Sequence, residues 1–163
     1  MLRNKAAAPD FSLTDIDGNV VRLGDLHQGR PLVLLFFRGE FCPTARRDLQ
    51  AYADIYNRAQ ALGAELVGIS ADIPRNHAVL RDNLWVPFPL LSDPTFATSS
   101  AYGVYKSDDV GEGPEPHGEP ALFIIDADGL IAYSQVMTGP KGIAAPSEVA
   151  MILVYMAMNE GRY

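Results

Sequence analysis

Two apolar runs separated by a helical pattern constrain the fold of this chain more than any other feature. The first run, PLVLLFF at residues 31–37, has strand length and no polar position, as expected for a strand covered on both faces. The second run, AELVGIS at residues 64–70, follows a stretch in which apolar residues recur at helical spacing up to Gly63. Because crossovers between parallel strands are right-handed, these runs predict a β-α-β unit at the centre of an α/β sheet.

Further elements on both sides of this unit predict a mixed sheet with helices on both faces. Residues 10–23, DFSLTDIDGNVVRL, alternate around Asp17-Gly18-Asn19, which predicts an N-terminal β-hairpin. Residues 119–136 predict a second hairpin, and we expect Ser147 to be the N-cap of a final helix. Shorter patterns predict a helix at residues 75–83, a strand within residues 88–94 and a helix within residues 95–104. This order predicts a thioredoxin-like, three-layer α/β/α fold with a mixed central sheet and an N-terminal β-hairpin extension.

Length and charge limit the classes of protein to which the chain can belong. Its 163 residues match the size of one domain, which we take as residues 1–163. A formal net charge of -7 repels phosphate backbones and anionic lipid, so we expect no nucleic acid and no membrane as partner. The first residues, MLRNKAAAPD, lack the apolar segment of a secretory signal, so we expect a cytoplasmic protein.

Cysteine and histidine are too few for a zinc site or an internal disulfide. The chain has one Cys and three His, without the spacing of metal ligands. We therefore expect no metal and no cofactor, and any redox chemistry must use a thiol from outside the chain. The longest apolar stretch, VAMILVYMAM at residues 149–158, is about half of the ~20 residues that a membrane span needs. It predicts a buried C-terminal helix or the subunit interface of a homodimer.

The single cysteine, Cys42, lies where the strand at residues 31–37 ends and the next helix begins. In open α/β sheets ligands bind outside the carboxyl ends of the strands, so this position makes Cys42 a candidate site residue. Unpaired N–H groups and the positive end of the helix dipole favour the thiolate, which is the nucleophilic form of cysteine. The alternative is an inert core residue, because free cysteine is among the most buried residue types.

Charged residues flank Cys42 on both sides. Arg38 precedes it, and Arg46 and Arg47 follow it by about one helical turn, whereas Glu40 opposes their charge. Any of the three arginines could stabilise a thiolate, and we expect Arg46 to be the nearest helper. The alternative is that the adjacent arginines form a solvated helix face.

Five segments of the chain, in order, carry a family resemblance: APDFSLTDIDGNVVRLGDL, LVLLFFRGEFCPTARRDL, ELVGISAD, FPLLSDPTFATSSAYGV and EPALFIIDADGLI. Together they resemble the alkyl hydroperoxide reductase and thiol-specific antioxidant (AhpC/TSA) family, the peroxiredoxin-like branch of the thioredoxin fold. In this family a cysteine thiolate attacks a peroxide oxygen and becomes a sulfenic acid, which a second thiol reduces. The resemblance implies that Cys42 is the reacting residue.

Three departures from the family pattern concern the site. Peroxiredoxins carry Pro-x-x-x-Thr-x-x-Cys, whereas counting back from Cys42 places Gly39 at the Thr position and Leu35 at the Pro position. The segment EFCPTAR is closer to the Trp-Cys-Pro-x-Cys-Arg pattern of thioredoxin-like reductases, with Ala45 in place of the second cysteine. Peroxiredoxins also place an arginine just before the strand that begins ALFII, where this chain has Pro120.

Pro120 is a candidate site residue through the same resemblance. In thioredoxin-like proteins the proline at this point is cis and packs against the active-site cysteine, so the resemblance implies a cis Glu119-Pro120 bond. The alternative is an ordinary trans proline at the first position of a strand, where proline is tolerated.

Thr44 and the three histidines complete the candidates. Thr44 either hydrogen-bonds the Cys42 sulfur or exposes its hydroxyl on the first helical turn. His117 either approaches Cys42, as a proton donor or as a partner of the thiolate, or stays solvated in a loop rich in Gly, Pro and Glu. We expect His27 and His77 to lie at the surface.

Two functions fit these features. The first is a one-cysteine, thiol-dependent antioxidant enzyme, in which hydrogen peroxide or an alkyl hydroperoxide oxidises Cys42 and an external thiol restores it. The reductant would be a thioredoxin-like protein or a low-molecular-weight thiol such as glutathione, and exchange of mixed disulfides is a chemical variant. The second is a thioredoxin-fold binding or interaction protein that has lost efficient catalysis. The missing Thr, Arg and second Cys favour this second function.

Overall fold

The structure, a computed structural model, describes residues 2–107, 116–139 and 141–163. Its strands are β1 (Ser12–Thr14), β2 (Val20–Arg22), β3 (Leu32–Phe36), β4 (Glu65–Ser70), β5 (Leu90–Ser92), β6 (Lys106–Ser107), β7 (His117–Gly118), β8 (Ala121–Ile125) and β9 (Ile131–Val136). Its helices are α1 (Leu23–His27), α2 (Pro43–Ala61), α3 (Pro74–Leu84), α4 (Ala97–Ala101) and α5 (Pro146–Met158). A seven-stranded sheet has the order β2-β1-β5-β4-β3-β8-β9, and β6 pairs with β7 in a separate ribbon.

Strand β3 lies inside the seven-stranded sheet, between β4 and β8. It pairs in parallel with β4, with Phe36 opposite Ile69, and antiparallel with β8, with Phe36 opposite Ala121. All of its residues are buried, because both of its edges are paired and both of its faces are covered. The predicted β-α-β unit is therefore confirmed, with α2 as its helix.

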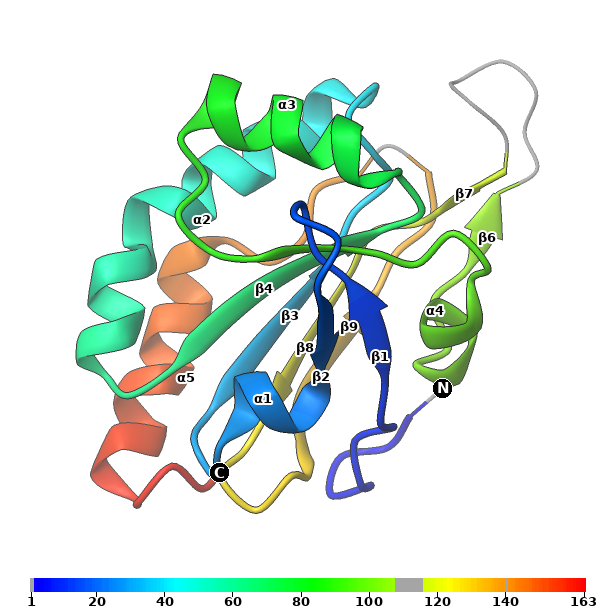
Figure 1. Cartoon of the computed structure of the whole chain (residues 1–163). Coiled ribbons are helices and arrows are strands. Elements are labelled where there is room, and N and C mark those ends of the chain that lie inside the picture. The colour runs from blue at the N-terminus through cyan, green and yellow to red at the C-terminus, as the bar shows by residue number, and fades with distance from the viewer. Residues whose placement is uncertain (1, 108–115, 140) are drawn as a thin grey trace.

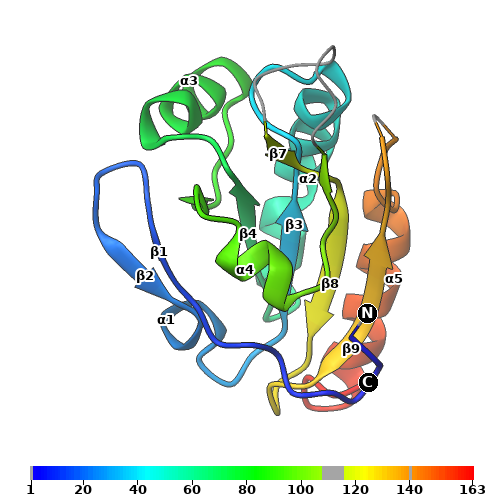
Figure 2. The same ribbon diagram turned by 90° about the vertical axis from the view of Figure 1, so that its right-hand side faces the viewer.

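Helices cover both faces of the sheet, as Figures 1 and 2 show from two directions. Side chains of α2, α3 and α5 share one apolar cluster with Val33 and Leu35 of β3. Side chains of α1 and of the end of α4 share the other cluster with Leu32, Leu34 and Phe36. Because successive side chains of a strand point to opposite faces, one apolar strand supplies both clusters. The predicted three-layer fold with a mixed sheet is confirmed, and β1 and β2 form the predicted N-terminal hairpin, which pairs with β5.

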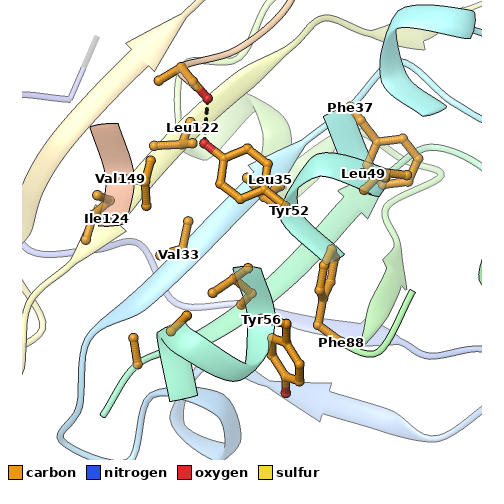
Figure 3. Close-up of a cluster of buried hydrophobic side chains, with 14 of the residues drawn as sticks. Val33, Leu35, Phe37, Leu49, Tyr52, Tyr56, Phe88, Leu122, Ile124 and Val149 are labelled. Atoms are coloured by element: carbon orange, nitrogen blue, oxygen red, sulfur yellow. Dashed lines mark hydrogen bonds between the residues drawn. The ribbon is translucent and has the colours of Figure 1, made fainter. Parts of the chain in front are cut away.

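Tyr52 of α2 joins the core to the segment that follows β9. Its ring packs with Leu35 and Leu122, and its hydroxyl donates a 2.6 Å hydrogen bond to the carbonyl oxygen of Ala144 (Figure 3). A buried tyrosine hydroxyl needs such a partner. The bond ties Ala144, in the segment between β9 and α5, to the middle of α2.

The C-terminal apolar stretch forms α5, which packs on α2. Val149, Leu153 and Met156 are buried there, whereas Met151 and Met158 are exposed. The expectation of a Ser147 N-cap is wrong: the N-cap is Ala145 and the helix begins at Pro146. Proline suits the first helical position because its ring fixes φ and its missing N–H has no intrahelical partner there. Among the described residues, no helix combines the length and apolar character that crossing a membrane requires.

The expectation that His27 and His77 lie at the surface is wrong for His77 and only partly right for His27. His77 on α3 is fully buried, and its Nε2 lies 2.7 Å from the hydroxyl of Ser70. Burial lowers its pKa from 6.5 to about 4, because the apolar surroundings disfavour the charged ring. His27 is half-buried, with its Nε2 2.7 Å from the carbonyl oxygen of Asp126.

Stability is expected to fall in acid partly through His77. As the pH falls from 6.5 towards 4, His77 takes up a proton in the unfolded chain before it does so in the folded chain. The free energy of unfolding therefore decreases between pH 6.5 and pH 4 and levels off below pH 4. A pKa shift of this size corresponds to about 3 kcal/mol of stability lost in acid. Urea unfolding of the wild type and of His77→Gln, measured at several pH values, checks this, since the variant should lose about 3 kcal/mol less between neutral and acid pH. Parallel pH curves for the two proteins would contradict the assignment.

Gly68 in β4 is expected to tolerate no side chain. A Cβ at this position would lie 2.6 Å from Cδ2 of Leu90 and 3.2 Å from Cε1 of Phe37, and both neighbours are packed in the core. Gly68→Ala should therefore lower the free energy of unfolding by about 1–3 kcal/mol, measured by urea unfolding. Gly24→Ala is the matched control, because nothing lies within 4 Å of a Cβ there. Equal stability of the two variants would contradict the packing argument.

Candidate functional site

Cys42 is the N-cap residue of α2, at the end of the short turn that leaves β3. Its N–H donates to the carbonyl oxygen of Gly39 at 3.2 Å, and its own carbonyl accepts the N–H of Arg46 at 3.1 Å, which begins the helix. Gly39 has φ +149°, a conformation that residues with a side chain rarely adopt, so the turn requires glycine here. The predicted position of Cys42 at the joint of strand and helix is confirmed, one residue before the first helical turn.

A small hollow opens beside the Cys42 side chain. It encloses about 330 Å³ when the open space at its mouth is included, and apolar groups of Leu35, Phe37, Leu49 and Ile143 line most of it. Cys42 itself is only 2% exposed. The space that a small molecule could occupy beside the sulfur is about 10 Å³, which is room for about one water-sized group.

Two of the expected site residues, Thr44 and Pro120, lie around this hollow with Cys42. Thr44 lines it from the first turn of α2, and Pro120 lines it from the residue before β8. Ala45, at the position of a second cysteine, is buried in the same lining. The cis conformation of the Glu119-Pro120 bond stays a prediction.

The arginine that contacts the sulfur is Arg38, whereas we had expected Arg46 to be the nearest. Nη1 of Arg38 lies 3.9 Å from Sγ of Cys42, and the Arg38 side chain is buried. Arg46 instead donates from Nε to the carbonyl oxygen of Glu40 at 2.6 Å and forms an ion pair with the Glu40 carboxylate. Because its guanidinium is engaged by a carboxylate, Arg46 holds the turn before Cys42.

His117 reaches the site through Arg38. Its Nε2 lies 2.9 Å from Nη2 of Arg38, so one guanidinium contacts both the sulfur and the imidazole. The ring is buried rather than solvated, and it packs against Phe41 with ring centroids 5.1 Å apart. His117 therefore approaches Cys42 through a second residue.

Glu119 supplies the charge that balances Arg38. Its Oε2 lies 3.5 Å from Nε of Arg38, and both side chains are buried. The sequence reading did not select Glu119. The signal that locates it is the antiparallel register of β3 and β8, which, continued past Phe36 and Ala121, brings residues 38 and 119 opposite each other.

A second carboxylate fixes the other side of the turn. Oδ2 of Asp72 accepts the N–H of Glu40 at 2.7 Å. Burial raises the pKa of Asp72, and the hydrogen bond from Glu40 partly offsets this rise. The turn is thus held by Asp72 from β4's carboxyl end and by Arg46 from α2.

Asp48 and Lys141 are lining residues that the sequence reading missed. Asp48 comes from α2 and Lys141 from the segment after β9. Burial raises the pKa of Asp48, while hydrogen bonds from the Ile143 N–H and from Arg47 lower it. Asp48 follows Thr44 by four residues, a helical spacing that could have indicated it, but no local pattern indicates Lys141. In the described parts of the chain no group of three or more His, Cys, Asp and Glu side chains is placed to hold a metal ion.

Comparison of folds places the chain among known structures. Peroxidoxin BcpB from Mycobacterium tuberculosis superposes with a TM-score of 0.80, covering 95% of this chain and 97% of that chain at 24% identity. A yeast mitochondrial 1-Cys peroxiredoxin gives a TM-score of 0.83 over 98% of this chain and 78% of that chain, at 19% identity. At these identities the likeness establishes the thioredoxin-type fold.

Comparison of sequences establishes the family. Residues 5–134 match the model of the AhpC/TSA family. A putative peroxiredoxin of Mycobacterium tuberculosis is 33% identical over 138 residues, which are 85% of this chain and 87% of that relative. A chloroplastic peroxiredoxin Q of Oryza sativa subsp. japonica is 32% identical over 128 residues, which are 78% of this chain and 56% of that relative. The chain is therefore a peroxiredoxin-like protein with a thioredoxin fold, and it belongs to the AhpC/TSA family.

Proposed function

We propose that this protein is a thiol-dependent peroxidase of the one-cysteine type, in which Cys42 reduces a peroxide and an external thiol restores Cys42. The observation that carries the proposal is the placement of the chain's single cysteine at the N-terminus of α2, beside a hollow, with Nη1 of Arg38 3.9 Å from its sulfur. The thiolate is the form of cysteine that attacks peroxides, and a cation beside the sulfur stabilises negative charge that develops there during the attack. Membership of the AhpC/TSA family supports the reaction class.

The first half-reaction oxidises the sulfur. The Cys42 thiolate attacks one peroxide oxygen, the O–O bond breaks, and the second oxygen leaves as water or an alcohol after taking a proton. Cys42 becomes a sulfenic acid and the peroxide is reduced. Thr44 and Pro120 line the small apolar space beside the sulfur at which the peroxide oxygen is attacked.

The second half-reaction needs a thiol from outside. That thiol attacks the sulfenic sulfur, an S–S bond forms and water leaves; a second thiol then releases a disulfide and the Cys42 thiol. The reductant is a low-molecular-weight thiol or a thioredoxin-like protein. The yeast mitochondrial 1-Cys peroxiredoxin, a fold neighbour, is described as resolved through glutathione and thioredoxin systems, which supports this class of reductant.

One observation favours the second function, a binding protein without turnover. If Ala45 is taken as the cysteine position of Pro-x-x-x-Thr-x-x-Cys, then Cys42 falls at the Thr position and Arg38 at the Pro position. All three residues line the hollow. In this register the reacting cysteine of the family is absent, and Cys42 occupies the position of the family's threonine.

Homodimer formation, disulfide exchange and a cytoplasmic location stay predictions.

Oxidation of Cys42 by peroxide decides between these two functions. In the first, hydrogen peroxide should oxidise Cys42 at least about 100 times faster than a free cysteine derivative at the same pH, as expected for a thiolate beside a buried cation. Cys42→Ser should abolish thiol-dependent peroxide consumption and leave the far-UV circular dichroism spectrum and the thermal midpoint close to those of the wild type. Peroxide consumption retained by Cys42→Ser would show that Cys42 is not the reacting residue. A wild-type rate equal to that of the free cysteine derivative would support the binding protein.

Restoring the second cysteine is a test of the site's geometry. Residues 42 and 45 occupy the N-cap and the third position of α2 and line one hollow, so Ala45→Cys should form a disulfide with Cys42 on oxidation. Intact-mass measurement with and without reductant detects the loss of two hydrogens. Ala61→Cys is the control, because a cysteine at the far end of a 19-residue helix lies too far from Cys42 to form an intramolecular bond. Failure of the Ala45→Cys disulfide would mean that the two side chains do not face one space.

A further inference from the structure

We propose that Arg38 is a catalytic residue that supplies the cation absent from the position of Pro120, and that His117 positions it as a hydrogen-bond acceptor rather than as a proton donor. This inference rests on the proposed peroxidase function. The family places its arginine just before the strand that is β8 here, where this chain has Pro120. The sequence offers Arg38 only as one of three arginines near Cys42 and does not link it to the position of Pro120, which lies 82 positions later.

The register of the sheet brings the substitute to the same place. β3 and β8 are antiparallel neighbours, with Phe36 opposite Ala121. Continuing that register places residue 37 opposite Pro120 and residue 38 opposite Glu119. The strand end that carries Arg38 therefore lies beside the strand start that carries Pro120, and both residues line the hollow that holds Cys42.

The hydrogen-bond chemistry fixes the state of His117. Every guanidinium nitrogen is a donor and none accepts. Nη2 of Arg38 lies 2.9 Å from Nε2 of His117, closer than Oε1 of Glu119 at 3.7 Å, so we assign Nε2 as the acceptor of the Arg38 hydrogen bond. This assignment makes the ring neutral and places its hydrogen on Nδ1, which is buried and has no hydrogen-bond partner among the described residues. A nitrogen that accepts from Arg38 holds no proton to pass towards the peroxide. His117 is thus a positioning residue for Arg38.

Two further contacts hold the guanidinium in one orientation. Oε2 of Glu119 lies 3.5 Å from Nε of Arg38. The ring of Phe41 lies 5.6 Å from Cζ of Arg38 and packs edge-on against His117. Glu119 is itself tied by its N–H to the carbonyl oxygen of Tyr105. Because these groups are buried, the guanidinium keeps Nη1 towards Sγ of Cys42 without reorganising during the reaction.

Charge balance explains why the arrangement suits an oxidation cycle. With Cys42 as a thiol, the Arg38 cation is balanced by the Glu119 carboxylate and His117 is neutral. When the thiolate forms, Arg38 contacts both this anion and the Glu119 carboxylate. As the thiolate attacks, the same Nη1 faces the sulfur and the oxygen that becomes bonded to it, so the cation stabilises the charge that moves between them.

The first experiment measures the rate at which hydrogen peroxide oxidises Cys42 in Arg38 variants. Arg38→Met should lower this rate by about 100-fold, and Arg38→Lys should recover part of it, because Lys keeps the charge but not the fork of donors. Since Arg38→Met leaves Glu119 buried without its cation, the double variant Arg38→Met/Glu119→Gln removes both charges and should be equally slow while folded. Arg81→Met is the control, because Arg81 is exposed and pairs with its neighbour Asp82 on α3.

The second experiment separates positioning from proton donation. His117→Gln keeps an acceptor near the place of Nε2 but cannot donate a titrating proton, so it should retain the wild-type pH dependence and a rate within about threefold. His117→Leu removes the acceptor and should lower the rate about tenfold or more, as a lost charge-assisted hydrogen bond does. His27→Gln is the matched control outside the site. In addition, ¹⁵N NMR of the reduced protein at pH 7.5 should show the Nδ1–H tautomer for His117.

The outcomes distinguish this inference from the proposed function. Equal peroxide rates for wild type and Arg38→Met would overturn the role of Arg38 while leaving a fast wild-type peroxidase in place. Equal losses in His117→Gln and His117→Leu, or an Nε2–H tautomer, would overturn the positioning role. A wild-type Cys42 that reacts no faster than a free cysteine derivative would overturn the proposed function, and the inference with it.

Discussion

The burial of β3 between two paired strands is the constraint on which the rest of the structure depends. Because β4 and β8 satisfy both of its edges and apolar clusters cover both of its faces, the chain can turn only at its carboxyl end. There Gly39 allows the backbone to reverse, and Pro43 begins α2. Cys42 occupies the residue between the turn and the helix. The position of the sulfur therefore follows from the packing of β3.

A buried ion pair gives this joint its chemistry. Taking the Arg38 and Glu119 charges out of water costs free energy, and their attraction offsets that cost only if the geometry holds. In return, the ion pair places the guanidinium: Glu119, His117 and Phe41 hold it near the sulfur, so it needs no reorganisation during the reaction. Arg46 and Asp72 have a different task, because they hold the turn at Glu40 and leave the contact with the sulfur to Arg38.

Much of the fold and part of the site could be predicted from local patterns. The apolar runs located β3 and β4, the Asp-Gly turns located both hairpins, and the break after the first run located Cys42 at the start of a helix. His77 was misplaced because a histidine on a helix gives no local sign of burial, whereas Ser70 and the apolar core around it exist only in the folded chain. Arg46 was chosen over Arg38 because sequence distance from Cys42 could not reveal that Glu40 engages Arg46.

The sequence by itself determined the β-α-β centre, the family and the residue most fit for redox chemistry, since each depends on side chains a few positions apart. Only the tertiary structure decided which charges surround the sulfur. Arg38 and His117 are 79 positions apart, and their contact exists because β8 lies antiparallel beside β3 in one register. Strand order and register are properties of the whole sheet, where a shift of one residue turns every side chain to the other face. For that reason the partners of Cys42 could be assigned only in the folded chain.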